Sequence, residues 1–264
     1  MSDVKKIATR ESYGRTLVEL GKENDKIVVL DADLAESTKT GVFKKAFPER
    51  HFDCVIAKAD MIGIAAGLAA AGMVPFASSF AMFAAGRAFE QIRNSVGYPH
   101  LNVKICATHA GVSVGEDGAT HQCNEDLALM RTIPGMVVLN PADDTETALA
   151  LRAAAEYVGP VYMRLGRLAV PVINDPATYK FEIGKAVTLR EGTDATIAAT
   201  GLMVARALEA ADMLAAEGLH VRVLNFHTLK PMDVKAACKA ANETGAIVTA
   251  EEHSVIGGLY SAVC

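Results

Sequence analysis

The sequence Ile56-Ala-Lys-Ala-Asp-Met-Ile-Gly-Ile-Ala-Ala-Gly-Leu-Ala-Ala-Ala-Gly72, continued by Met73-Val-Pro-Phe-Ala-Ser-Ser-Phe-Ala-Met-Phe-Ala-Ala-Gly86, decides the fold. It carries no charged side chain from position 61 to 86, which is long enough for a membrane span of ~20 apolar residues. Ala and Gly dominate it, however, and Gly72 and Pro75 interrupt it. The pattern therefore predicts a buried helix, a turn, a buried strand and a second helix in a non-membrane protein.

Two features of this stretch indicate close packing and a site. Gly63 and Gly67 form a G-x-x-x-G motif, which outside a membrane lets two elements approach closely. Lys58 falls near the expected helix N-terminus, where the macrodipole disfavours a cation. A charge in such a place is either solvated and unimportant or part of a site.

Outward from this stretch, strand and helix patterns alternate along the chain, which is typical of parallel β-α-β units. We expect two consecutive α/β domains with mostly parallel sheets. The first domain would span residues 1–167, beginning with an amphipathic helix within 1–25 after a short lead. A Pro- and Asn-containing linker would follow at 168–182, and a second domain at 183–264. The second domain looks incomplete, because a helix that begins near Gly257 is not finished at Cys264.

Composition excludes several classes of function. The chain has 264 residues, 51% hydrophobic and 22% charged, with a formal net charge of −5. This charge offers no basic footprint for nucleic acid or an anionic membrane. The five cysteines form no C-x-x-C pair and match no metal-ligand spacing, so we expect no bound metal and free thiols in a reducing cytoplasm. The first six residues contain no apolar segment typical of a secretory signal.

The densest polar cluster is Gly115-Glu-Asp-Gly-Ala-Thr-His-Gln122, which follows a predicted strand and Thr108-His109. Glycine permits close backbone approach to a ligand, and His with Asp can bind hydroxyls and move protons. On spacing alone, a solvated loop with a helix cap remains the alternative.

This loop closely resembles the corresponding loop of transketolases, which use thiamine diphosphate. Further segments resemble family motifs in family order: Ala8-Thr-Arg10, Asp31-Ala-Asp-Leu-Ala-Glu-Ser37, Asp60-Met-Ile-Gly-Ile-Ala-Ala-Gly67, Ser79-Phe-Ala-Met-Phe83 and Thr108-His109. The resemblance covers essentially the whole chain. It is to the C-terminal section of a split transketolase, because the Gly-Asp-Gly…Asn motif of a diphosphate-binding domain is absent from the sequence.

The resemblance implies a set of site residues. Phe80 and Phe83 match the aromatic pair that contacts the pyrimidine ring, although without the resemblance two core phenylalanines would be the simpler interpretation. The remaining matches are Asp33 and Met61 near the cofactor, Asp117 and His121 at the ketose hydroxyls with His121 near the reacting carbon, and Arg10, Ser37, His109 and Arg164 at the sugar phosphate.

Lys58 departs from the family pattern. It stands three residues before Met61, where the family has a Glu that hydrogen-bonds the pyrimidine ring and starts the chemistry. An ammonium only donates a hydrogen bond and opposes protonation of the ring nitrogen by like charge. The sequence therefore predicts impaired activation of the cofactor.

The family likeness also implies partners. Thiamine diphosphate would be shared with an N-terminal transketolase section that holds Mg²⁺, and the pyrimidine-binding domain would self-associate. The reaction would move a two-carbon ketol unit between sugar phosphates, as in pentose phosphate metabolism. Two alternatives remain open: a catalytically impaired binding subunit, and a subunit similar to deoxyxylulose-phosphate synthase or a 2-oxoacid dehydrogenase β-chain.

Overall fold

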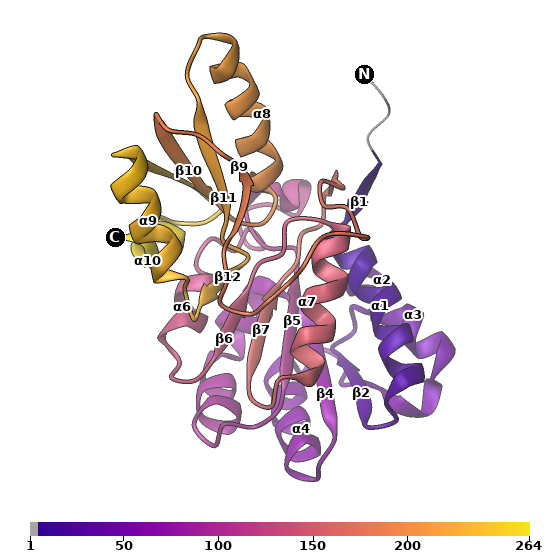
Figure 1. Ribbon diagram of the computed structural model, residues 1–264. Coiled ribbons are helices and arrows are strands. Elements are labelled where there is room, and N and C mark those ends of the chain that lie inside the picture. The colour runs from indigo at the N-terminus through magenta and orange to yellow at the C-terminus, as the bar shows by residue number, and fades with distance from the viewer. Residues whose placement is uncertain (1–4) are drawn as a thin grey trace.

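A seven-stranded sheet forms the centre of the molecule in this computed structural model, which describes residues 5–264 (Figure 1). Its strands, in spatial order, are β12 (Thr228–Lys230), β6 (Val137–Leu139), β7 (Val161–Arg164), β5 (Lys104–Thr108), β4 (Val74–Phe80), β2 (Ile27–Asp31) and β3 (His51–Asp53). All pairs are parallel except β12 with β6. The parallel order means that the carboxyl ends of these strands share one edge.

Helices cover both faces of this sheet, as a doubly wound fold requires. One face packs α1 (Thr9–Glu23), α3 (Thr40–Ala46) and α7 (Asp144–Glu156). The other packs α4 (Lys58–Ala70), α6 (Asp126–Thr132) and the segment that runs through η2 (Met82–Arg87), α5 (Phe89–Gln91) and η3 (Ile92–Gly97). Alternation along β2 explains the division, because Ile27 and Val29 join the first core and Val28 and Leu30 the second.

A second, four-stranded sheet has the order β13 (Ile247–Ala250), β10 (Ala195–Ala199), β11 (Val221–Asn225) and β9 (Val187–Arg190), with only β9 antiparallel to its neighbour. It packs with α8 (Met203–Ala216), α9 (Val234–Thr244) and α10 (Leu259–Val263). The expected succession of two mostly parallel α/β units is thus confirmed (Figure 1).

The remaining elements are short: α2 (Ala35–Thr38), η1 (Pro48–Arg50) and η4 (Val112–Asp117), together with the pair β1 (Lys6–Ala8) and β8 (Ala169–Pro171). β1 and β8 pair antiparallel, so the beginning of the predicted linker is tied to the start of the chain. β12 comes from the second unit yet extends the first sheet. The two units are therefore interlocked rather than joined only by a linker.

One local prediction needs correction. The second helix of the opening stretch, predicted over 82–96, is not one regular helix, since two π-helical stretches flank the three residues of α5. The amphipathic helix predicted within 1–25 is present as α1, which begins at Thr9 after β1. The start of that predicted segment, and part of the signal-peptide assessment, fall on residues 1–4, outside the described residues. Within residues 5–264, no helix combines the length and the apolar character needed to cross a membrane.

A buried carboxyl group connects α7 to both the linker and the second sheet. Glu146 is fully buried and accepts hydrogen bonds from the Tyr179 hydroxyl, from Asn225 Nδ2 at 2.7 Å and from the Ala142 amide at 2.6 Å. Burial raises the pKa of Glu146 to about 7. The protonated acid is therefore the form that the folded protein favours.

We predict that Glu146→Gln removes one pH-dependent component of stability. Because the folded pKa is raised, the native state keeps a proton that the unfolded chain releases above about pH 4.5, so stability falls as pH rises towards about 7. This component amounts to roughly 3 kcal/mol in the parent. Urea unfolding at pH 5 and pH 8 measures it. The control Glu156→Gln, exposed on the same helix, should keep the parental pH dependence; equal pH dependence in parent and Glu146→Gln would contradict the prediction.

Candidate functional site

Four stacked or edge-on rings meet at the carboxyl edge of the first sheet. Phe80, at the end of β4, stacks on His109, which follows β5, with ring centroids 3.9 Å apart. Phe80 and Phe83 lie 6.0 Å apart and nearly parallel, at 19°. His121 meets both phenylalanines edge-on, 5.1 Å from the Phe83 centroid. The parallel pairing of β4 with β5 through Phe80 and Thr108 brings these residues together.

His109 is held as a neutral ring between Arg10 and Thr108. Arg10 Nη1 lies 3.1 Å from His109 Nε2 and donates to the Ser37 carbonyl at 3.0 Å. Because guanidinium only donates, Nε2 accepts, and the ring proton sits on Nδ1, 2.9 Å from the Thr108 hydroxyl. Burial, then the positive charges of Arg10 and Arg167, lower the pKa of His109 to about 4. His109 also has a φ of 58°, a strained value for a residue with a side chain.

Lys58 lies at the Phe83 end of the ring cluster. It is only 6% exposed, begins α4, and places Nζ 5.6 Å from the Phe83 ring centroid. Among residues 5–264 its ammonium makes no hydrogen bond or ion pair, so a cation–π contact is the interaction that offsets its unfavourable place at a helix N-terminus. The turn before it is strained, because the β-branched Val55 has a φ of 53°.

The other predicted residues divide between this edge and the interior. Asp33 and Ser37 line one hollow beyond β2, together with Asp53. Met61 is fully buried in α4, one turn after Lys58. Asp117 is exposed in η4 and close enough for its charge to raise the pKa of His109. The structure thus brings nearly all of the predicted set to one edge of the sheet.

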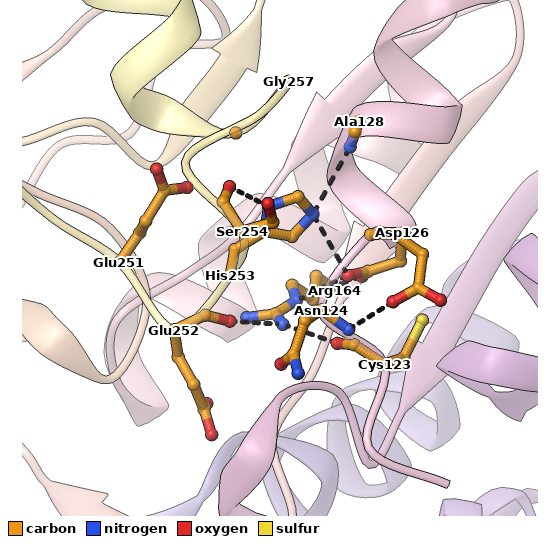
Figure 2. Close-up of polar contacts among 12 residues, drawn as sticks. Cys123, Asn124, Asp126, Ala128, Arg164, Glu251, Glu252, His253, Ser254 and Gly257 are labelled. Atoms are coloured by element: carbon orange, nitrogen blue, oxygen red, sulfur yellow. Dashed lines mark hydrogen bonds and ion pairs between the residues drawn. The ribbon is translucent and has the colours of Figure 1, made fainter. Parts of the chain in front are cut away.

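Arg164, predicted at the sugar phosphate, instead places its guanidinium beside the buried Asp126. Its guanidinium is 4% exposed, and Nε donates to both Asp126 oxygens, at 3.2 and 3.0 Å (Figure 2). Nη2 donates to the carbonyls of Cys123 and Glu252, at 3.3 and 2.7 Å. Through these hydrogen bonds Arg164 connects β7 to the segment 123–126 and to Glu252, and so stabilises the interior.

Arg167 is a second arginine near the ring cluster, and its charge reaches His109. It lies beyond the end of β7, it is half-buried, and it donates to the Val114 carbonyl and to the exposed Glu116. Its charge reaches both Arg10 and His109, lowering their pKa values. The sequence distinguishes the two arginines, because Arg164 lies within a buried strand whereas Arg167 follows Gly166 in the loop.

The residues at this edge suit the aromatic ring of a thiamine cofactor, but not the proton exchange that this ring requires. The half-buried face of Phe83 beside Phe80 suits an aromatic ring. The group that would exchange a proton with that ring does not fit, because Lys58 stands at the position where the likeness calls for a carboxyl. The nearest carboxylate in sequence, Asp60, is exposed. Within residues 5–264 no cluster of His, Cys, Asp and Glu is arranged to hold a metal ion.

Comparison with known proteins finds matches to both α/β units. The family model for the transketolase pyrimidine binding domain matches residues 5–172, and that for the transketolase C-terminal domain matches residues 184–264. A protein of Methanocaldococcus jannaschii named as a transketolase C-terminal section is 52% identical over 96% of this chain and 80% of its own length. A 6-deoxy-6-sulfo-D-fructose transketolase subunit of a Clostridium species is 46% identical over 96% of this chain and 78% of its length.

A solved structure shows the same fold. It is described as a split gene transketolase in an inactive β4 tetramer, and it is 59% identical with a TM-score of 0.91, covering 98% of this chain and 84% of that one.

We predict stability losses of different size for the two arginines. Arg164→Met leaves Asp126 buried without its partner and should lower the free energy of unfolding by about 3–5 kcal/mol. Arg167→Met removes an ion pair whose Glu116 side chain is 76% exposed to solvent, and should cost far less stability. Urea unfolding of both variants checks this, and similar losses in the two would refute the distinction between an interior and a site arginine.

Proposed function

Because this chain belongs to the transketolase family, we propose that it acts as one subunit of a split, thiamine-diphosphate-dependent transketolase. An N-terminal section would supply the diphosphate-binding domain and Mg²⁺. The observation that carries the proposal is the ring cluster of Phe80, Phe83, His109 and His121 at the carboxyl edge of the sheet, flanked by Arg10 and Arg167.

The proposed substrates are ketoses and aldoses with an anionic end. Arg10 and Arg167 are cations on either side of a neutral His109, a combination that can bind an oxyanion by charge and by hydrogen bonds. A phosphate satisfies it, and so does the sulfonate suggested by the name of the Clostridium relative. Asp117 and His121, on the following loop, would bind hydroxyls of the ketose.

The bound cofactor supplies the carbanion chemistry, and this chain contributes binding and proton control. Phe80 and Phe83 would hold the pyrimidine ring. Lys58 would hinder protonation of the pyrimidine ring, because its ammonium cannot accept a proton and repels positive charge on the ring. This observation favours a second candidate function for this chain: a subunit that assembles with its partner and turns over slowly.

We predict that Lys58→Glu raises transketolase turnover by roughly 10²–10⁴-fold, the usual contribution of a positioned acid–base group. The assay combines the chain with its N-terminal section, thiamine diphosphate and Mg²⁺, and follows two-carbon transfer from a ketose phosphate. The control Lys58→Gln removes the charge without supplying a carboxyl and should give no comparable gain. No gain with Lys58→Glu would show that the lysine is not what limits this subunit.

The exposed face of α4 supports self-association of the pyrimidine-binding domain. Gly63, Ile64 and Gly67 share this face, and within residues 5–264 nothing lies within 4 Å of a side chain built at either glycine. The preceding turn exposes Val55 by 67% and Ile56 by 62%. A surface of small and apolar residues suits close contact with the same surface of a second copy.

We predict that Gly67→Leu weakens self-association and leaves the fold intact. The added side chain meets open space in the single chain, and leucine favours the helix over glycine, so only a partner surface would collide with it. Sedimentation analysis compares the variant with the parent. Ala216→Leu, exposed at the end of α8 and away from this face, serves as the control and should keep the parental oligomer. An unchanged oligomer in Gly67→Leu would place the interface elsewhere.

A further inference from the structure

The second unit contacts the loop that carries Asp117 and His121, although all of the proposed site residues belong to the first unit. The contact comes from the segment after β13, Glu251–Ser254. The Ser254 amide donates to the Asn124 carbonyl at 2.8 Å. The buried ring of His253 has Nε2 3.8 Å from Asp126 Oδ1, beside the Arg164 pair (Figure 2).

Glu252 provides the most direct link. Its carboxylate accepts a hydrogen bond from the Ser113 amide, at the start of η4. The same carboxylate lies against Gly111, where an added Cβ would be 2.2 Å from Glu252 Cδ. Gly111 also has a φ of 82°, so both its backbone conformation and the close approach of Glu252 require glycine there.

Arg164 extends this link to the far end of the loop. Its Nη2 donates to the carbonyls of Glu252 and Cys123, and the Gly111 amide donates to the same Cys123 carbonyl at 2.8 Å. These hydrogen bonds therefore connect both ends of the segment 111–123 to Glu252. Between those ends Glu116 and Asp117 are exposed, and Arg167 is the side chain from outside the loop that holds it.

We propose that Glu252 is a positioning residue: the second domain uses its carboxylate, supported by Arg164, to fix the loop that presents Asp117 and His121. The significance of this loop for catalysis rests on the proposed function. The positioning itself rests only on the contacts described. It gives the second domain a role at the site without requiring any of its side chains to touch a substrate.

Hydrogen exchange of the full chain tests the proposal without sugar, cofactor or turnover, so its outcome is independent of the proposed function. In Glu252→Ala the Ser113 amide loses its charged acceptor, and amides in 111–122 should exchange at least about tenfold faster than in the parent. Glu252→Gln keeps an acceptor oxygen and should restore much of the protection. Glu252→Asp keeps the charge but shortens the reach, and should loosen the loop as alanine does.

The neighbouring glutamate provides a matched control. Glu251 points away from Glu252, and its carboxylate accepts from the Leu259 and Tyr260 amides at the start of α10 (Figure 2). Glu251→Ala should therefore speed exchange in 259–263 and leave 111–122 as in the parent. Unchanged exchange of 111–122 in both Glu252→Ala and Glu252→Asp, or equal loosening of this loop by Glu251→Ala, would overturn the proposal.

Discussion

Parallel pairing of β2, β4, β5 and β7 is the constraint on which the rest of the structure depends. It places the residues after each strand along one edge, so that side chains far apart in sequence become neighbours. Arg10 reaches the Ser37 carbonyl beyond β2 and the His109 ring beyond β5, while Phe80 at the end of β4 stacks on that ring. The two apolar cores on either face hold the strands in this arrangement.

The charge of the site follows from this geometry. Burial and the charges of Arg10 and Arg167 keep His109 neutral, and Lys58 and Arg87 add two further cations over Phe83. Such a site attracts an anionic substrate, which agrees with sugar phosphates or sulfonates. The same excess of positive charge is unsuited to a step in which a ring nitrogen becomes protonated. Under the proposed function, substrate recognition and cofactor activation would depend on different residues, and Lys58 would affect the second.

Much of this could be predicted from the sequence, because hydrophobic runs and turn residues identify strands, helices and their order. Family and fold class are confirmed, whereas the roles of individual residues stay predictions. The prediction that Arg164 lies at the sugar phosphate did not consider burial, since a motif match ignores whether a side chain points from a buried strand or from the loop after it, where Arg167 lies. The crossing of β12 into the first sheet and the reach of Glu252 to Ser113 are tertiary contacts between distant segments, which no local pattern encodes.

The central claim is that this chain builds a transketolase site in which Lys58 slows activation of the cofactor. The most direct measurement is the rate at which the reactive carbon of bound thiamine diphosphate exchanges its proton with solvent in the complex with the N-terminal section. The account predicts slow exchange in the parent and exchange faster by roughly 10²–10⁴-fold in Lys58→Glu. Exchange in the parent as fast as in that variant would contradict it.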